Sequence, residues 1–372
     1  MLLWLWLTLA ALAGNLTVHV LDVGQGDAIL IEAPDDKRVL IDAGTAKSGV
    51  AELLLQRGIK KLNMVVATHP HADHIGGMVD ILKTFDVGLY VDNGMTHTTL
   101  TYSRTMQAVE KREVNYRSAV AGRTFKLGSE ATLTVLHPRQ TPLRGTRSDL
   151  NSNSVVLRLV HGNNCFLFTG DAEDPTERDL INRGIEQCDV LKVAHHGSGH
   201  STSDSFLAAV KPQVAIISAG ANNRYGHPDP ELVGRLQRAN VPFHRTDLRG
   251  TISLKSDGSV VSVTTEKAAP AQSADATLAE DSTQPAAMPA ASLSTRAGAA
   301  SPASTTTNIN AATAAELDQL PGIGPSKAAA IVSYRSQHGP FASCLDLSKV
   351  YGIGPKTVAG IVEFCTTEDQ TP

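Results

Sequence analysis

The sequence has few cysteines, no strong excess of charge and no stretch long enough to span a membrane. Its four cysteines form no Cys-x-x-Cys pair, which argues against a cysteine-based zinc site. The net charge of −4 excludes a basic coat that binds nucleic acid through bulk charge. With 42% hydrophobic and 19% charged residues, the composition is that of a globular protein, and 372 residues predict two domains. Fibrous, wholly disordered and polytopic membrane classes are therefore excluded.

The apolar run from Leu2 to Ala13 is shorter than the ~20 residues that a bilayer span requires. It is typical of the apolar core of a signal peptide, and Ala11-Leu12-Ala13 suits a cleavage site, although no Lys or Arg precedes it. We predict that residues 1–14 are a signal peptide or a short membrane anchor, and that the protein is secreted or periplasmic. A buried strand or a truncated membrane segment is the alternative. Export would allow the cysteines to pair, and Cys344 with Cys365 is the candidate pair by sequence distance.

Composition divides the rest of the chain into three parts. Residues 15–265 interleave apolar runs with amphipathic stretches, which predicts an α/β domain with a sheet core. Residues 266–307 are rich in Ala, Ser, Thr and Pro, which predicts a disordered linker. Residues 308–365 are helical again. The predicted strands of the first domain are Thr17–Val23, Ala28–Glu32, Arg38–Asp42, Met64–Thr68, Gly88–Val91, Thr132–Leu136, Val155–Val160, Cys165–Thr169, Val190–Ala194, Val214–Ser218 and Thr251–Leu254. Its predicted helices are Gly49–Arg57, Gly76–Phe85, Tyr102–Arg112, Pro175–Arg183, Ser203–Val210 and Pro230–Ala239.

The strongest functional signal follows the strand Met64–Thr68. His69, His71, Asp73 and His74 lie within six residues, and two His at alternate positions of a strand end point the same way. Three imidazoles and a carboxylate suit zinc or a similar metal. Four ligands on one loop exceed what one tetrahedral ion with a bound water needs. We therefore predict two divalent metal ions, zinc or manganese; a His-rich surface loop is the alternative.

Further candidate ligands stand at the ends of other apolar runs. Asp171 follows Phe166–Thr169, where a carboxylate could bridge two cations. His195 and His196 follow Val193-Ala194, and His227 lies beyond Val214–Ser218. Asp149 precedes Val155–Val160 and is a weaker candidate.

At these residues the sequence resembles the metallo-β-lactamase fold superfamily. The superfamily's second motif is His-x-His-x-Asp-His, Leu40–Gly44 is similar to its first, and Thr169-Gly170-Asp171 is similar to its fourth. A more specific resemblance, over about Leu16 to Thr265, is to the soluble hydrolase domain of ComEC-type DNA-uptake channels. It includes Asp22-Val23-Gly24-Gln25-Gly26-Asp27, Asn151-Ser152-Asn153-Ser154, His195-His196-Gly197-Ser198 and Tyr225-Gly226-His227-Pro228.

The resemblance implies an αββα sandwich and a hydrolase centre. It implies that Asp42 orients the metal loop, and it places Asp73, His196 and Ser198 in the catalytic centre with Asp42. The superfamily's third motif, a Gly-rich loop ending in His, is not evident, and His137-Pro138 is a poor substitute. Asp149 or water could supply the missing ligand of the first metal. We find no channel helices, so we expect no transmembrane channel in this chain.

The C-terminal part contains an internal repeat. Leu320–Pro325 and Val350–Pro355 both carry Gly-Ile-Gly-Pro, with Pro at a helix start where it is tolerated. The repeat resembles tandem helix-hairpin-helix units of the ComEA-type competence receptor, which implies DNA binding through backbone N–H groups. Four basic and six acidic residues between positions 308 and 372 give a net charge of −2, so we expect weak, salt-sensitive binding. A protein-interaction module is the alternative. The candidate DNA-binding residues are Gly322, Ile323, Gly324, Lys327, Gly352, Ile353, Gly354 and Lys356.

Together these features predict an exported metal-dependent phosphodiesterase or nuclease that acts on DNA, in DNA uptake or in degradation of extracellular DNA. The predicted partners are DNA and the DNA-uptake machinery. One alternative is a hydrolase of a small ester, lactam or phosphocholine-type substrate, with the C-terminal module as an anchor. The other is a non-catalytic DNA-binding competence accessory.

Overall fold

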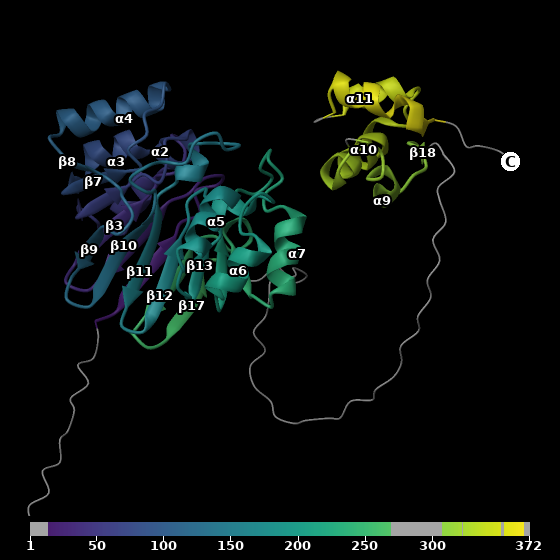
Figure 1. Cartoon of the computed structure of the whole chain (residues 1–372). Coiled ribbons are helices and arrows are strands. Elements are labelled where there is room, and N and C mark those ends of the chain that lie inside the picture. The colour runs from purple at the N-terminus through teal and green to yellow at the C-terminus, as the bar shows by residue number, and fades with distance from the viewer. Residues whose placement is uncertain (1–13, 269–306, 322, 351–352, 368–372) are drawn as a thin grey trace, which may run out of the picture. The chain divides into compact units, whose positions relative to one another are not determined.

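The computed structural model describes residues 14–268, 307–321, 323–350 and 353–367 (Figure 1). The chain divides into two compact units, within residues 1–282 and 283–372. The predicted N-terminal segment and most of the predicted linker lie outside the described residues. Residues 266 and 267 belong to the first unit, because their backbone N–H groups donate to Thr251 and Arg249. Among the described residues, no helix is both long and apolar enough to cross a membrane.

The first unit contains two large sheets. One has the order β17-β16-β1-β2-β3-β5-β7-β8, and the other β15-β14-β13-β12-β11-β10-β9. The strands of the first sheet are β1 Leu16–Val20, β2 Ile29–Ala33, β3 Lys37–Ile41, β5 Met64–Val66, β7 Leu89–Asp92, β8 Asn115–Ser118, β16 Ile252–Ser256 and β17 Val261–Thr265. Those of the second are β9 Thr124–Leu127, β10 Ala131–His137, β11 Val156–His161, β12 Asn164–Phe168, β13 Val190–Lys192, β14 Val214–Ile217 and β15 Phe243–Arg245. A small separate pair joins β4 Lys61–Leu62 to β6 Asp86–Val87.

Alternation along the strands divides the core into layers. In β2, Ile29 and Ile31 pack between the two sheets, whereas Leu30 faces the helices, because successive side chains of a strand point to opposite faces. In the second sheet, Phe166 lies between the sheets and Leu167 faces the other set of helices. The result is the predicted αββα sandwich, with helices on both outer faces (Figure 1). These helices are α1 Val50–Gln56, α2 Ala72–Ile75, α3 Met78–Thr84 and α4 Leu100–Lys111 over the first sheet, and α5 Asp174–Asn182, α6 Asp204–Val210 and α7 Pro230–Arg238 over the second; the short α8 Thr246–Arg249 follows β15.

The second unit is a small helical body. Its elements are β18 Thr307–Asn308, α9 Ala314–Leu317, α10 Pro325–His338, η3 Cys344–Lys349, α11 Pro355–Ile361, η4 Val362–Phe364 and β19 Cys365–Thr366. As the repeat predicts, α10 and α11 each begin at a proline that follows an extended glycine, Gly324 and Gly354. Thr307, placed in the linker by its composition, pairs instead with Cys365.

The other six predicted DNA-binding residues of this unit fall into three groups. Gly322 and Gly352 lie outside the described residues, as does the side chain of Lys356. Lys327 is half-buried in α10. Ile323 and Ile353 are buried in the unit's core, so a ligand could reach these two positions only through the backbone.

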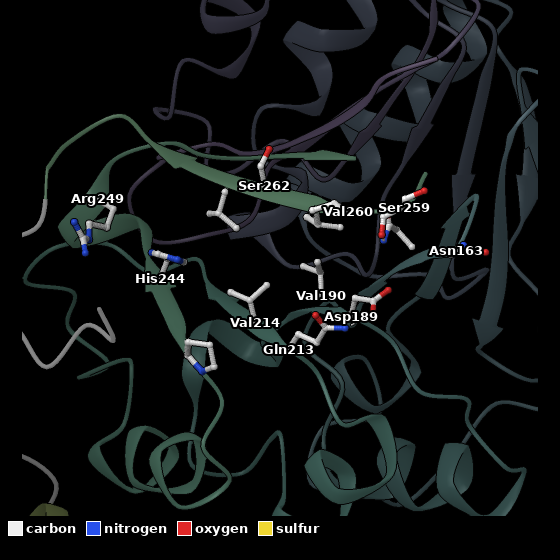
Figure 2. Close-up of a pocket in the computed structure, with 14 residues that line it drawn as sticks. Asn163, Asp189, Val190, Gln213, Val214, His244, Arg249, Ser259, Val260 and Ser262 are labelled. Carbon is white, nitrogen blue, oxygen red and sulfur yellow. Dashed lines mark hydrogen bonds between the residues drawn. The ribbon is translucent and has the colours of Figure 1, made fainter. Parts of the chain in front are cut away.

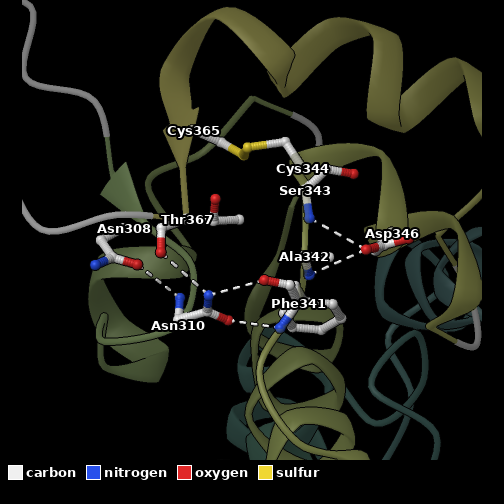
Figure 3. The surroundings of a disulfide bond; sticks show 9 residues. All are labelled: Asn308, Asn310, Phe341, Ala342, Ser343, Cys344, Asp346, Cys365 and Thr367. Atoms are coloured by element: carbon white, nitrogen blue, oxygen red, sulfur yellow. Dashed lines mark hydrogen bonds between the residues drawn. A yellow bond between two sulfur atoms is a disulfide. The ribbon is translucent and has the colours of Figure 1, made fainter.

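Both units contain a disulfide. The predicted pair Cys344–Cys365 is confirmed and joins η3 to β19 (Figure 3). Beside it, the Asn310 amide donates to the carbonyl oxygens of Phe341 and Thr367 and accepts from the Phe341 N–H. Cys165 and Cys188, whose pairing was left open, form the second disulfide in the first unit.

Candidate metal centre

Strand ends of the two sheets bring the predicted ligands together. His69 to His74 follow β5 and lead into α2. In the second sheet, β12, β13 and β14 are parallel, so their carboxyl ends lie at the same end of the sheet. Asp171 follows β12 at this end, and His195 and His196 follow β13 within the turn η2 (Ala194–Gly197).

Asp171 lies at the centre of the cluster, and its two carboxylate oxygens face different histidines. Oδ2 is 3.7 Å from His69 Nε2 and 3.5 Å from His195 Nε2. Oδ1 is 3.2 Å from His74 Nε2 and 3.6 Å from His196 Nε2. One carboxylate therefore stands between two histidine pairs, which is the arrangement expected of a bridging ligand.

The remaining two members of the loop motif complete these two groups. His71 Nδ1 is 2.9 Å from His69 Nε2, on the Oδ2 side of Asp171. Asp73 Oδ2 is 3.4 Å from His196 Nε2, on the Oδ1 side. We call the first set, His69, His71, His195 and Asp171 Oδ2, the Oδ2 group. The second set, Asp73, His74, His196 and Asp171 Oδ1, is the Oδ1 group.

The buried polar atoms of the Oδ1 group fit a cation. Among the described residues, His74 Nε2, His196 Nε2 and Asp171 Oδ1 are buried and form no hydrogen bond. Such atoms cost free energy unless a partner satisfies them. Ligand atoms of Asp73, His74 and His196, all in this group, lie within 4.8 Å of one another, and so do those of His69, His74 and Asp171, a set that spans both groups. Imidazole nitrogens and carboxylate oxygens are the donors that zinc and manganese accept.

The other ring nitrogen of three of these histidines is fixed by a partner. His74 Nδ1 lies 2.8 Å from Asp42 Oδ2, and Asp42 also accepts from the Thr68 N–H and hydroxyl. His196 Nδ1 lies 3.1 Å from the Ser218 carbonyl oxygen. His69 Nδ1 lies 3.2 Å from the Thr68 hydroxyl. Partners of this kind set the orientation of a metal-binding ring.

Local charges favour a cation at this point. Burial would raise the pKa of Asp171, but His74, His196 and His195 hold it well below its usual value. Burial would lower the pKa of His74, but Asp171 and Asp42 raise it well above its usual value. Burial lowers the pKa of His69, with a further contribution from His74, so this ring is neutral and able to bind a metal.

Sequence reasoning missed a buried ion pair behind the centre. Lys192 Nζ lies 2.9 Å from Asp27 Oδ2, and Asp27 Oδ1 lies 3.3 Å from His196 Nδ1. Burial would raise the pKa of Asp27, but Lys192 and His196 hold it below its usual value. The available signal was a single lysine inside the apolar run Val190–Ala194, where an unpaired charge would be unfavourable.

Three other candidates lie outside both groups. The Asp149 carboxylate accepts hydrogen bonds from the Thr146 N–H and hydroxyl, at 2.8 Å each. These bonds stabilise the loop that contains both residues. His195, rather than Asp149, thus faces Asp171 Oδ2. The Ser198 N–H donates to the His195 carbonyl oxygen, and the Ser198 hydroxyl accepts from the His200 N–H. Ser198 directly follows the turn η2 and is not among the residues that line the pocket. His137, the substitute for the third motif, faces the Ser154 carbonyl oxygen instead.

His227 lies beside the centre. Its ring centroid is 5.7 Å from that of His195, and it lines the pocket. Among the described residues, neither His227 nor His71 and His195 belongs to a set of three ligand atoms that lie within 4.8 Å of one another. The pocket has a volume of about 450 Å³ and is also lined by His71, Asp73, Asp171 and Tyr225. The centre is therefore accessible to a substrate from this side.

A larger cavity, of about 950 Å³, lies elsewhere in the first unit. Figure 2 shows Val190 and Val214 on one side of it and Val260 and Ser262 on the other. None of the predicted site residues lines this cavity, so its volume has no bearing on the metal centre.

With this geometry, the chain belongs to the metallo-beta-lactamase superfamily, whose family model matches residues 21–221. The helix-hairpin-helix motif model matches residues 303–366.

The chain is 33% identical over 259 residues to ComE operon protein 3 of Bacillus subtilis, covering 64% of this chain and 33% of that protein. It is 35% identical over 243 residues to recombination protein 2 of Haemophilus influenzae, covering 63% and 28%. The chain thus spans about a third of the length of these relatives. The solved metallo-beta-lactamase fold protein YhfI of Bacillus subtilis aligns at 12% identity with a TM-score of 0.46, over 65% of this chain and 100% of that one.

Proposed function

We propose that the protein is an exported metal-dependent phosphodiesterase that cleaves DNA. The observation that carries the proposal is the position of Asp171, whose two oxygens each face a separate histidine pair. A carboxylate shared in this way suits two adjacent divalent cations. When bound, such a pair lowers the pKa of a water toward ~7 and stabilises both the attacking and the leaving oxygen of a phosphodiester.

The chain's own residues hold and orient this centre. The Oδ2 group would hold one cation and the Oδ1 group the other, with Asp171 common to both. Asp42 fixes the ring of His74, and Asp27 with the Ser218 carbonyl fixes that of His196. Because these partners are buried, the ligands are positioned before substrate arrives, which reduces reorganisation during the reaction.

The choice of DNA as substrate rests on the second unit and on the relatives. A helix-hairpin-helix module binds the nucleic-acid backbone through N–H groups at helix starts, and α10 and α11 supply two such starts. One relative is named recombination protein 2, and another is the competence protein ComA of Neisseria gonorrhoeae. This chain is 30% identical to ComA over 240 residues, which are 63% of this chain and 31% of that protein. These names favour a role alongside DNA-uptake machinery. The two disulfides favour an oxidising compartment, consistent with export.

The test is a comparison of substrates. Purified full-length protein is incubated with Mn²⁺ or Zn²⁺ and with linear duplex DNA, single-stranded DNA or a panel of chromogenic esters. We expect DNA to be degraded by the native chain and by the surface variant Asp80→Asn, but not by Asp171→Asn. Intact DNA with a folded, metal-loaded sample would reject the proposal, and turnover of esters alone would favour the small-substrate alternative.

A further inference from the structure

An exposed arginine and an exposed tyrosine, adjacent in the sequence, lie at the mouth of the metal pocket. Tyr225 lines the pocket and is 52% exposed. The Arg224 guanidinium carbon lies 4.9 Å from the centroid of the Tyr225 ring, and Arg224 donates to the Tyr225 hydroxyl at 2.7 Å. Arg224 is itself exposed. This pair places an exposed aromatic ring and a positive charge at the same point of the surface.

The turn that holds the pair is fixed by one side chain. The Asn223 amide accepts hydrogen bonds from the N–H groups of Tyr225 and His227, at 3.1 and 3.0 Å. It also donates to the carbonyl oxygens of Gly220 and His227. Because both ends of the turn bind to the same amide, the backbone at Tyr225 is held in place before any ligand binds.

A row of rings connects this pair to the centre. Tyr225 stacks on His227 with ring centroids 5.8 Å apart and an angle of 25°. His227 meets the ring of His195 at 5.7 Å, and His195 Nε2 is 3.5 Å from Asp171 Oδ2. The Arg224–Tyr225 pair therefore lies next to the Oδ2 group, where a group attached to a phosphate at the centre would extend.

We propose that Arg224 and Tyr225 form a subsite for the nucleotide next to the scissile phosphate, with its base stacked on the Tyr225 ring. This inference rests on the proposed function. The base takes the place of the guanidinium over the ring, and the guanidinium moves to a neighbouring phosphate, which arginine binds well. A base can stack on a side chain only when it has left the duplex stack. The subsite therefore selects single-stranded DNA or frayed ends.

The test compares a single-stranded tetranucleotide with the same tetranucleotide carrying stable abasic analogues. Tyr225→Ala should raise the KM for the base-containing substrate about 10-fold, with kcat changed less than twofold, because stacking contributes to binding and the centre is untouched. Its KM for the abasic substrate should not change. Tyr225→Phe retains the ring and should restore the native KM. The C-terminal unit, if it binds the backbone, treats both substrates alike, so full-length protein can be used.

Tyr116 provides the matched control, since it is 45% exposed and its hydroxyl donates to Asp92. Tyr116→Ala should leave both KM values unchanged. An equal rise in KM on both substrates in Tyr225→Ala, or no rise on either, overturns the stacking subsite while the phosphodiesterase activity stands. Failure of the native protein to cleave either substrate under Mn²⁺ or Zn²⁺ rejects the proposed function, and the subsite with it.

Discussion

At the scale of single residues, the centre depends on groups that do not face the proposed cations. Asp42 fixes the ring of His74, and Asp27 lies between Lys192 and the ring of His196. All of these side chains are buried. An oriented imidazole binds a cation without first losing rotational freedom, so these partners should contribute to metal affinity as well as to structure.

Asp42→Asn tests this contribution. The asparagine side chain can still accept a hydrogen bond from the Thr68 N–H. It lacks the negative charge of Asp42, which favours a proton on His74 Nδ1 and so leaves His74 Nε2 free for the metal. We expect metal affinity to fall about 10- to 100-fold, measured by competition with a chelator. Asp80→Asn, an exposed position, should leave affinity unchanged. Unchanged affinity in a folded Asp42→Asn protein would show that Asp42 has no role in orienting the centre.

His137 makes stability depend on pH. Burial lowers the pKa of His137 to about 4 from an ordinary value of 6.5. Below pH 6.5 the unfolded chain takes up a proton that the folded chain does not, so acid favours unfolding until the pH reaches about 4. Between pH 7 and pH 5 this residue should cost about 2 kcal/mol of stability.

Urea unfolding of the native chain and of His137→Asn at both pH values measures this cost. The variant should lose about 2 kcal/mol less than the native chain between pH 7 and pH 5. Other buried histidines contribute equally to both proteins, so the difference isolates His137. Identical losses would mean that folding leaves the pKa of His137 at its ordinary value.

At the scale of elements, the buried strands and the longer helices could be predicted from the sequence. The strands at the two edges of each sheet could not. Each predicted strand overlaps an observed one. The longer strands that were missed, β8, β9, β15 and β17, are the edges of the two sheets. An edge strand has a neighbour on one side only and faces solvent more, so its residues carry a weaker apolar signal; β8 reads Asn-Tyr-Arg-Ser.

Some features of the candidate site could be predicted from the sequence, and others could not. His69, His74 and Asp171 could be predicted because each of these polar residues lies after an apolar strand. The carboxyl ends of parallel strands lie at the same end of a sheet, which brings such residues together. The pairing of Asp27 with Lys192 could not, because it joins positions 165 residues apart. Nor does the sequence indicate which histidine faces which oxygen of Asp171, since that depends on how the two sheets pack.

The disulfides provide a test at this scale. Replacing Cys344 and Cys365 by alanine should lower the stability of the second unit by about 2–4 kcal/mol, because the unfolded chain gains conformational freedom. Calorimetry of the full chain should show the shift in one of two transitions. The matched pair of changes at Cys165 and Cys188 should shift the other. A shift of the same transition by both pairs would contradict independent folding of the two units.

At the scale of the whole molecule, each compact unit has its own hydrophobic core, and the ligand residues all lie in the first. We propose a division of labour in which the first unit cleaves DNA and the second retains it. Retention raises the local concentration of DNA at the centre without changing the chemistry.

Deletion of residues 308–372 tests this division. Turnover of short oligonucleotides should stay within about twofold of the native rate, because the first unit holds every ligand. Degradation of long duplex should slow, and DNA binding should lose its steep dependence on salt. Equal binding and degradation of long DNA by both proteins would favour the protein-interaction alternative for the second unit.

The most direct test of the central claim is titration of metal-free, full-length protein with Mn²⁺ or Zn²⁺ while the cleavage of single-stranded DNA is followed. We predict no cleavage without metal and a rate that rises until about two equivalents are bound, as expected for a bridged pair. Cleavage at the full rate without metal, or intact DNA once two equivalents are bound, would contradict the account.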